Sequence, residues 1–328
     1  MKKKIIILSY FPTYSALWWY GYFLNQELRE INKFDINFID LWKYLSRNPF
    51  IRLFHLFNYK LPYSSDIIIS VSPLLSKITH NSIASQKIII EHDLYPLISN
   101  SSLINKVIKF FYSYSLKMNK VISISEFSSK EFAKYYKLNK YPKIIYGGID
   151  HNSYFPGENT NKFDVNNLTF IHIGRSDKRK NIFFLLKVLK RFKGAKLIKI
   201  GELTKSEQKY VSDNLLNVEQ KCNIDQKTMR SLFLDADFLL FPSIYEGFGL
   251  PPLEAMACGC LALVGDNTGL KESCFEECRI DLNLDSWESR IRKICSEKSL
   301  QKNLKEKGLV HSNQFRWNKF TRDLIINI

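Results

Sequence analysis

The sequence predicts an α/β protein built from two doubly wound, Rossmann-like domains, each a parallel sheet covered by helices. Three observations lead to this prediction. The chain has 328 residues, more than one hydrophobic core normally supports. Short apolar runs alternate with longer segments of helical periodicity, as in parallel sheets. A polar segment rich in Gly and Asn, residues 147–167, interrupts the alternation, and we place the domain linker there.

The first domain is expected over residues 1–150, where six short apolar runs predict buried strands. They are Ile5–Leu8, Asn37–Ile39, Ile67–Val71, Ile88–Ile90, Val121–Ile124 and Ile144–Ile145. Between them, apolar residues recur at helical spacing in two segments, Leu17 to Ile31 and Leu103 to Tyr114. Strands and helices therefore alternate through the whole domain.

The second domain is expected over residues 151–310, where the alternation restarts. Strands are predicted at Thr169–Ile173, Lys196–Ile200 and Phe238–Phe241, with a helix from Ile182 to Phe192. Residues 311–328 close the chain with an amphipathic helix that we expect to brace the two domains. Ligands of doubly wound sheets bind at the carboxyl ends of the strands, so we expect a central cleft that both sheets face.

The formal net charge of +16 is concentrated in the first half of the chain. Residues 1–150 contain 20 basic and 10 acidic side chains. Segments 41–65 and 94–125 contain no acidic residue and combine lysines and arginines with aromatic residues. Such segments fit an anionic membrane surface, and a solvated basic face is the alternative. Nucleic acid is not expected as a partner, because no motif that binds it accompanies the charge.

The amino terminus resembles a signal peptide, but its apolar run breaks at Ser9 and Pro12. No stretch reaches the roughly 18 apolar residues of a membrane span. The six cysteines lack a histidine at zinc spacing and are expected to be reduced thiols. We therefore expect a cytoplasmic protein that is peripheral at the inner face of the cell membrane.

A basic loop, residues 174–181, follows the first strand of the second domain and leads into a helix. Gly174 allows a tight turn, Arg175 offers a fork of donors, and Lys180 offers a point charge. Cations at a helix amino end oppose the helix dipole unless an anion binds there. The loop therefore indicates a phosphate site, and a basic surface turn is the alternative.

A second loop, residues 242–250, follows the strand Phe238–Phe241, and this loop and the helix after it carry two glutamates spaced eight residues apart. Glu246 lies in the loop, and Glu254 lies in the first turns of the next helix, which starts at the Pro251–Pro252 pair. Carboxylates accept hydrogen bonds from hydroxyl-rich molecules. For Glu254 the alternative is a favourable interaction with the helix dipole.

Three further segments carry weaker signals. His92 and Asp93 follow the strand Ile88–Ile90, where either a structural or a functional role fits. Ser125 or Glu126 is expected to cap a helix. Asp235 and Asp237 have the spacing of a metal-binding pair, but they precede a strand and so lie at the amino edge of the sheet. Metal binding is therefore not expected.

The motifs above resemble those of the retaining GT-B glycosyltransferases of family 4. Residues 246–259 resemble that family's paired-glutamate signature, and Gly174, Arg175 and Lys180 resemble its diphosphate-binding residues. Further landmarks follow in the expected order over almost the whole chain, namely residues 92–93, 125–128, 148–150 and 315–317. The loop 9–15 departs from the pattern, because the usual glycine pair is missing.

The resemblance implies a role for each candidate residue. Glu246 would contact the donor sugar and Glu254 the ribose, while Gly174, Arg175 and Lys180 would hold the diphosphate. His92 would touch the sugar, and Asp93 would face the acceptor. The backbone of four residues would meet the sugar and phosphates: Gly247, Phe248, Gly249 and Leu250.

The expected function is metal-independent, retaining transfer of a hexose from a nucleotide diphosphate sugar, without a cofactor. The donor would be GDP-mannose or a UDP-sugar, and the acceptor a lipid-linked or polysaccharide chain in O-antigen or capsule synthesis. Two alternatives stay open. The first is a sugar-nucleotide epimerase or a glycan phosphorylase on the same fold, of which the phosphorylase would bind pyridoxal phosphate. The second is a non-enzymatic module that binds membranes or nucleic acid.

Overall fold

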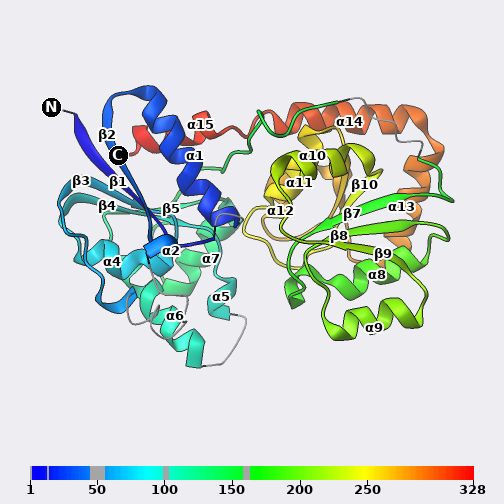
Figure 1. Cartoon of the computed structure of the whole chain (residues 1–328), viewed down its shortest axis with the longest axis horizontal. Helices are drawn as coiled ribbons and strands as arrows, with labels where there is room; N and C mark the ends of the chain where they lie inside the picture. The colour runs from blue at the N-terminus through cyan, green and yellow to red at the C-terminus, as the bar shows by residue number, and fades with distance from the viewer. Residues whose placement is uncertain (1, 13–14, 45–55, 99–102, 158–162) are drawn as a thin grey trace. The chain divides into compact units, whose positions relative to one another are not determined.

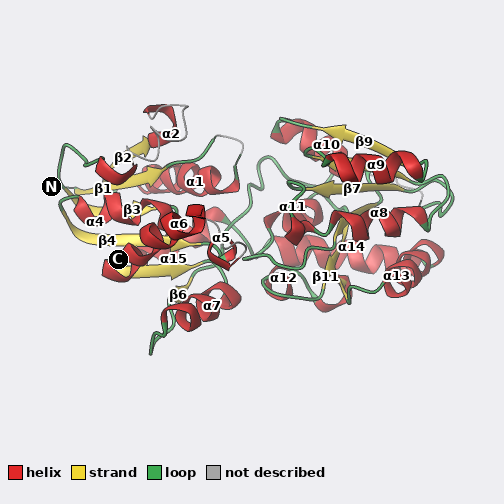
Figure 2. Ribbon diagram, turned by 90° about the horizontal axis from the view of Figure 1, so that it is seen from below, coloured by secondary structure: helices red, strands yellow, loops and turns green. Residues whose placement is uncertain are grey.

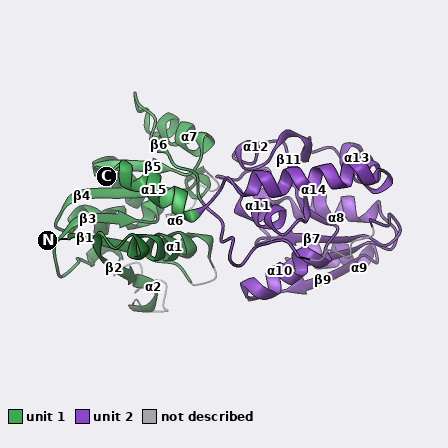
Figure 3. Ribbon diagram, turned by 90° about the horizontal axis from the view of Figure 1, so that it is seen from above, with its two compact units in different colours: residues 1–147, 317–328 green, residues 148–316 purple. Residues whose placement is uncertain are grey.

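The computed structural model describes residues 2–12, 15–44, 56–98, 103–157 and 163–328. The chain forms two compact units, one of residues 1–147 with 317–328 and one of residues 148–316 (Figure 3). Most of the basic and aromatic side chains expected at a membrane from segment 41–65 lie outside the described residues, as do residues 13–14 of the loop 9–15. Each unit contains one six-stranded parallel sheet, which confirms the predicted fold class.

The sheet of the N-terminal unit has the strand order β2-β1-β3-β4-β5-β6. Its strands are β1 (Lys3–Ser9), β2 (Phe34–Asp40), β3 (Ser65–Ser70), β4 (Ala84–Glu91), β5 (Lys120–Ser123) and β6 (Lys143–Ile144). All five neighbouring pairs are parallel. Each predicted apolar run of this half therefore forms a strand, with ends that shift by a few residues.

Helices cover both faces of this sheet, because alternate residues of each strand are buried on opposite sides. Ile6, Leu8 and Ile68 pack with Ile78 and Phe111 from the helices on one face. On the other face, α1 packs against β1, β2 and α15 (Figure 1). The helices are α1 (Ala16–Ile31), α2 (Leu41–Tyr44), η1 (Pro73–Leu75), α4 (Ser76–Asn81), α5 (Tyr95–Ile98), α6 (Leu103–Ser113), η2 (Tyr114–Lys117), α7 (Glu126–Tyr136) and α15 (Trp317–Ile326).

The C-terminal unit has the strand order β12-β11-β10-β7-β8-β9, the order of dinucleotide-binding sheets. Its strands are β7 (Thr169–Ile173), β8 (Lys196–Ile200), β9 (Asn217–Lys221), β10 (Phe238–Phe241), β11 (Leu261–Gly265) and β12 (Arg279–Ile280). Strands β7, β8 and β10 have the predicted bounds. The other three were not predicted, because β9 is polar, β12 has two residues, and β11 directly follows the glutamate signature.

Helices flank the second sheet as well, and Figure 2 shows them in red around the yellow strands. Leu185 of α8 and Trp287 of α13 share the main core with Phe170 and Leu240 of the sheet. Helices α11 and α14 pack against each other and against β11. The helices are η3 (Lys178–Lys180), α8 (Ile182–Lys190), α9 (Lys205–Asp213), α10 (Gln226–Asp235), α11 (Leu250–Ala257), α12 (Leu270–Ser273), η4 (Glu276–Cys278), α13 (Leu284–Ser296) and α14 (Lys298–Ser312).

The last helix, α15, belongs to the N-terminal unit, although the sequence that precedes it belongs to the other one. Trp317 and Phe320 are buried, and the Trp317 ring stacks on Phe23 with centroids 5.2 Å apart. The edge of the Tyr20 ring packs against Trp317 as well. These aromatic contacts attach the end of the chain to α1.

The structure places two polar side chains as the sequence predicted, Ser125 at the start of a helix and Asp237 at the amino edge of a sheet. Ser125 is the N-cap of α7, and its hydroxyl accepts a hydrogen bond from the backbone N–H of Ser128 at 3.0 Å. Asp237 lies at the amino edge of the second sheet, and its carboxylate accepts the backbone N–H groups of Thr169 at 2.8 Å and Phe163 at 3.3 Å. Asp237 therefore holds the backbone at the start of β7.

Replacing Asp237 with alanine is expected to lower the free energy of unfolding by about 2–3 kcal/mol, because one buried and one partly buried backbone N–H group lose their acceptor. Chemical denaturation would measure the change. The matched control is Asp235→Ala, since Asp235 is exposed and lies two residues away. Equal stability of the two variants would contradict this role of Asp237.

Candidate active site

Two loops of the C-terminal unit begin side by side at the carboxyl ends of β7 and β10. These strands are neighbours in the sheet, and the strand order reverses its direction between them. Doubly wound sheets bind their ligands at this reversal. The loop after Ile173 and the loop after Phe241 both start there. The fold therefore brings together the two segments that the sequence singled out.

The loop after β7 is compact and rises into α8 through one 3₁₀ turn. Gly174 has φ +140°, a conformation that favours glycine. The turn η3 contains Lys178, Arg179 and Lys180, and Asn181 follows in the left-handed region. The backbone N–H of Ile244 donates to the carbonyl of Arg179 at 2.7 Å, which joins this loop to the one after β10.

Glu246 and two cations form the centre of the site. The Lys180 ammonium lies 2.5 Å from Glu246 Oε1, and Arg179 Nη1 lies 3.6 Å from Glu246 Oε2. Lys180 and Glu246 are each only 7% exposed, and Lys180 Nζ lies 4.6 Å from the centre of the Phe241 ring. The site therefore concentrates two cations on one carboxylate in a largely dehydrated setting.

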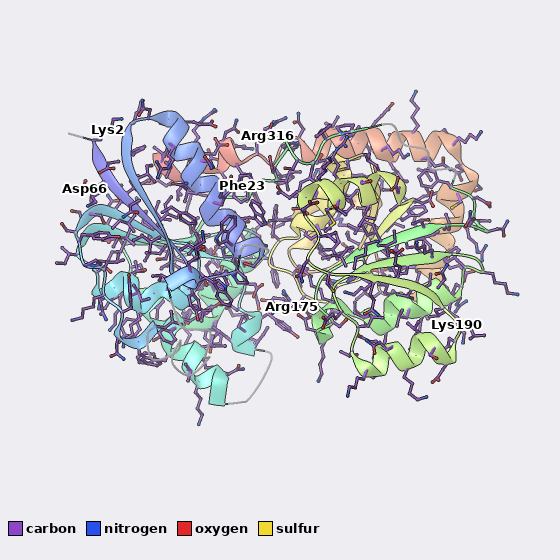
Figure 4. All side chains as sticks on the ribbon, in the orientation of Figure 1. Lys2, Phe23, Asp66, Arg175, Lys190 and Arg316 are labelled. Carbon is purple, nitrogen blue, oxygen red and sulfur yellow. The ribbon has the colours of Figure 1, made fainter. Side chains whose placement is uncertain are left out.

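The structure brings Lys180 and Glu246 into direct contact and adds Arg179, which sequence reasoning missed. The signal that could have found it is the run Lys178–Lys180, three cations in one turn of which only one was chosen. Arg175 is exposed at the start of the same loop. In Figure 4 it lies on the opposite side of the C-terminal unit from Lys190, the last residue of α8.

The loop that carries Glu246 is fixed by hydrogen bonds to residues 268 and 269, directly before α12. The N–H of Glu246 donates to Thr268 Oγ1 at 3.0 Å, and its carbonyl accepts from Gly269 at 3.0 Å. Gly249 is the N-cap of α11 with φ +112°. A β-carbon there would lie 2.7 Å from Leu270 Cδ2, so this close packing also needs glycine. Glu246 is thus held in a rigid loop.

The proline pair limits the number of backbone N–H donors at the start of α11. The helix begins at Leu250, as the proline pair predicted, but Pro251 and Pro252 carry no N–H. Phe248 is buried, and its carbonyl accepts from the Ser273 hydroxyl at 2.8 Å. Backbone N–H groups for an anion could come from Gly247 to Leu250, before the prolines.

Glu254 lies in the second turn of α11, separate from the charged centre. Its side chain is partly buried, and burial raises its pKa to about 7, with the negative charge of Asp150 acting in the same direction. Its charge also contributes to a raised pKa of Tyr154, which is caused mainly by burial. A carboxylate with this pKa changes its charge near neutral pH.

Replacing Glu254 with glutamine is expected to stabilise the protein more at pH 8 than at pH 5. The folded state disfavours the charged carboxylate, so the free energy of unfolding falls as pH rises from about 4.5 to 7 and stays low above. Glutamine removes this penalty, which is at most about 3 kcal/mol. Thermal unfolding at both pH values checks it, with the exposed Glu276→Gln as control. Equal gains at both pH values would contradict the assignment.

In the N-terminal unit, His92 and Asp93 follow β4 at the carboxyl edge of the sheet. His92 Nε2 lies 2.8 Å from the carbonyl of Val71, so this nitrogen carries the hydrogen and Nδ1 is an acceptor. Burial lowers the pKa of His92 to about 4, and the ring packs against Tyr20 with centroids 4.4 Å apart. His92 is therefore a neutral imidazole at physiological pH.

Asp93 has a local structural contact. Its carboxylate accepts the backbone N–H of Tyr95 at 3.0 Å, at the start of α5. Glu91, the last residue of β4, is fully buried and accepts from Ser123 Oγ at 3.0 Å. Burial raises the pKa of Glu91 well above its ordinary value, and the charge of Asp93 adds to the effect. The carboxyl edge of this sheet therefore presents two hydrogen-bond acceptors, the neutral imidazole of His92 and the partly buried carboxylate of Asp93.

Within the described part of the chain, no group of three or more His, Cys, Asp or Glu side chains is arranged to hold a metal ion. All six cysteines are free thiols, of which four are buried. A hollow of about 340 Å³ lies at the amino ends of β5 and β6, lined in part by Lys120, Leu138 and Tyr141. It shares no residue with the loops described above.

Residues 158–310 match a model of the family described as "Glycosyl transferases group 1". The O-antigen chain mannosyltransferase RfbU of Salmonella typhimurium is 28% identical over 217 residues, which cover 62% of this chain and 59% of that protein. The serotype-specific mannosyltransferase WbdA of Escherichia coli is 38% identical over 80 residues, which cover 24% of this chain and 10% of that protein. The match to RfbU thus spans about three fifths of its length.

Two solved structures show the same fold. Sucrose-phosphate synthase from Thermosynechococcus elongatus has a TM-score of 0.79 at 15% identity, covering 98% of this chain and 97% of that one. Anabaena HepE, solved in complex with UDP and glucose, has a TM-score of 0.73 at 14% identity and covers 99% of both chains. The fold is GT-B, and the sequence relatives support a GT-B glycosyltransferase.

Proposed function

We propose that this protein is a retaining glycosyltransferase of family 4 that transfers a hexose from a nucleotide diphosphate sugar to a lipid-linked or polysaccharide acceptor in surface glycan synthesis. One observation carries the proposal: Lys180, Arg179 and Glu246 converge where the sheet order of the C-terminal unit reverses. Cations there suit a diphosphate, and a carboxylate beside them suits sugar hydroxyls.

The chemistry requires stabilisation of a departing anion. The bond between the anomeric carbon and the diphosphate oxygen breaks, and its electron pair stays on that oxygen. The acceptor hydroxyl oxygen bonds to the anomeric carbon from the same face, and its proton passes to the departing phosphate. Cations placed at this phosphate stabilise the transition state more than the ground state. Lys180 and Arg179 are suited to this task, with Arg175 as a third cation from the same loop.

The proposed donor follows from the relatives and from the charge balance of the site. RfbU and WbdA are mannosyltransferases by name, so GDP-mannose is the first candidate, and a UDP-sugar is the second because HepE was solved with UDP. Lys180, Arg179 and Arg175 carry three positive charges against the one negative charge of Glu246, and the remaining +2 can balance a diphosphate, so we propose transfer without a metal. Glu254, whose pKa is raised to about 7, is proposed to accept hydrogen bonds from the ribose hydroxyls.

The N-terminal unit is proposed to take the acceptor at the carboxyl edge of its sheet. Asp93 would face the acceptor, and the neutral His92 would accept a hydrogen bond from a substrate hydroxyl through Nδ1. A neutral imidazole suits this role better than a cation, because it can accept as well as donate. The order of units would then match the expected division into acceptor-binding and donor-binding halves.

Thermal shift assays across GDP-, UDP- and ADP-sugars test the donor, followed by a transfer assay with a lipid-linked glycan extract. We expect selective stabilisation by one sugar nucleotide, with the product anomer retained by NMR and the rate unchanged by EDTA. If no sugar nucleotide stabilises the protein, the proposed donor class is overturned. If the product anomer is inverted, the proposed retaining mechanism is overturned. An absorbance spectrum free of pyridoxal phosphate separates transferase from phosphorylase.

No described helix is long and apolar enough to cross a membrane. We propose instead that the surface formed by α5, α6 and η2 binds anionic headgroups from the inner face. Ile98 is 50% exposed, Phe110 39% and Leu116 46%. The same segments expose Lys106, Lys109 and Lys117. Exposed apolar side chains among cations are typical of interfacial binding.

Replacing Lys106 and Lys109 with glutamate is expected to weaken binding to phosphatidylglycerol vesicles by about 10-fold or more, since each lysine contributes about 1 kcal/mol at an anionic surface. Co-sedimentation at two salt concentrations measures this. The control carries the same change at Lys187 and Lys190, which are exposed on α8 of the other unit. Equal loss in both variants would show a general effect of net charge and would refute this surface.

A further inference from the structure

Strand β8 contains a lysine that is fully buried. Lys199 has 0% exposure, although lysine is almost never buried without a partner. Its ammonium donates to the carbonyl of Gly174 and to the carbonyl of Ile200 at 3.0 Å, and it lies 3.5 Å from the carbonyl of Gly201. Among the described residues, no carboxylate forms an ion pair with it. The direct contacts of the charge are thus backbone carbonyls, and the carboxylates of Glu207 and Asp177 act on it only from a longer distance.

Lys196, on the same strand, shows the ordinary behaviour. Its side chain is exposed and forms an ion pair with Glu219 at 2.5 Å. Burying an ammonium without a carboxylate in direct contact costs free energy, which an apolar side chain of similar length would avoid. Burial therefore lowers the pKa of Lys199 to about 8. A buried cation at this position needs an explanation beyond the stability of the sheet.

Lys199 lies directly beneath the proposed diphosphate loop. It donates to the carbonyl of Gly174, and a β-carbon on Gly174 would lie 3.0 Å from Lys180 Cε. The N–H of Gly174 is itself held by the carbonyl of Ile200 at 3.1 Å. The glycine turn therefore contacts both the buried Lys199 and Lys180, the lysine that contacts Glu246.

A neutral histidine, His172, lies next to Lys199 beneath the loop. His172 is opposite Lys199 in the strand register and is also fully buried. Its Nδ1–H donates to the carbonyl of Leu240 at 2.8 Å, and its ring stacks on Phe241, which lies under Lys180. Burial, and then the charge of Lys199, lower the pKa of His172 well below its ordinary value. Of this buried pair, Lys199 therefore carries the positive charge and His172 is neutral.

We propose that Lys199 is a positioning residue of the diphosphate site, which fixes the Gly174 turn and adds a buried positive charge beneath the bound phosphates. The inference rests on the proposed function, because that function supplies the diphosphate. Lys199 itself does not touch the donor. It acts through Gly174, whose neighbours Arg175 and Lys180 are the proposed phosphate contacts, and through its field, which solvent screens weakly at a buried site.

This role predicts a pH dependence. A bound diphosphate favours the charged form of Lys199, so affinity should fall as pH rises through about 8, where the free protein loses this charge. The other ionisable groups near Lys199 are His172, Lys180, Asp177, Glu207 and Cys222. Cys222→Ser removes the exposed thiol among them, so the profile is best recorded in that background.

Calorimetric titration of the full-length protein with GDP and UDP tests the proposal, together with guanosine and uridine. Lys199→Met is expected to weaken diphosphate binding by about 10-fold or more, to leave nucleoside binding unchanged, and to flatten the pH profile. Lys199→Arg should restore part of the affinity and keep affinity from falling through pH 8, because arginine stays charged. Lys196→Met is the control on the same strand and should bind like the wild type.

The outcomes separate the two levels of the proposal. If the wild type binds GDP or UDP, and Lys199→Met binds it with the same affinity and the same pH dependence, the role of Lys199 is overturned. The proposed function is not affected by that result. Failure of the wild type to bind any nucleoside diphosphate overturns the proposed function, and the inference with it. If Lys199→Met does not fold, the pH profile of the Cys222→Ser protein decides, and a flat profile between pH 7 and 9 refutes the proposal.

Discussion

Replacing Lys180 with methionine is expected to lower kcat for sugar transfer by about 10²–10⁴-fold, because the departing diphosphate loses a preorganised cation. Methionine keeps most of the apolar stem that packs over Phe241 and beside Gly174. The loss should therefore arise in the chemical step more than in folding. Steady-state kinetics with a fixed donor, and circular dichroism to verify the fold, would measure it.

The matched control is Lys178→Met, because Lys178 is exposed and lies in the same turn as Lys180. This variant should retain transfer within a few fold of the wild type. A Lys180→Arg variant adds information, since a guanidinium keeps the charge but presents it in a different geometry. Normal turnover of a folded Lys180→Met protein would show that the diphosphate is stabilised elsewhere.

Replacing Glu246 with glutamine is expected to lower kcat/KM by about 10²–10³-fold. Glutamine preserves size and can accept a hydrogen bond from Lys180, but it removes the negative charge that orients Lys180 and Arg179. It also weakens the acceptor proposed for the donor sugar. Kinetics with the selected donor measure the loss, and the exposed Glu276→Gln serves as the control.

The double variant, Lys180→Met with Glu246→Gln, should lose little more than the worse single variant. The two side chains are in direct contact at 2.5 Å and act as one unit, and effects within such a unit are not additive. Fully multiplicative losses would indicate that the two residues act independently, against the arrangement described for the site. A donor-binding measurement on each variant separates the effect on affinity from the effect on turnover.

Much of the fold followed from the sequence because parallel sheets leave a strong local pattern. All nine predicted runs form strands, and β7, β8 and β10 have the predicted bounds. Strand β9 was not predicted from the sequence, because Asn217–Lys221 is mostly polar. An edge strand with one partner needs few apolar residues. Pairing with β8 makes it a strand, and no local pattern records that pairing.

The candidate site followed from the sequence only in part. Glu246, Lys180 and Gly174 could be found because glycine turns and charged residues after apolar runs mark the ends of strands. Arg179 could not be separated from Lys178 or Lys180, since all three are cations in one turn. Lys196 and Lys199 are three residues apart in β8 and so lie on opposite faces of the sheet, and the sequence does not show which of the two faces is covered.

The sequence by itself therefore determined the fold class, the two glycine-containing loops and the residue types that can hold a diphosphate. These depend on periodicity and on short-range backbone preferences, which adjacent residues encode. The tertiary structure alone decided which cation reaches Glu246 and that Lys199 is buried beneath Gly174. The physical reason is separation along the chain: Lys180 and Glu246 are 66 residues apart, and Lys199 and Gly174 are 25 apart. Their contacts exist only once the strands have paired.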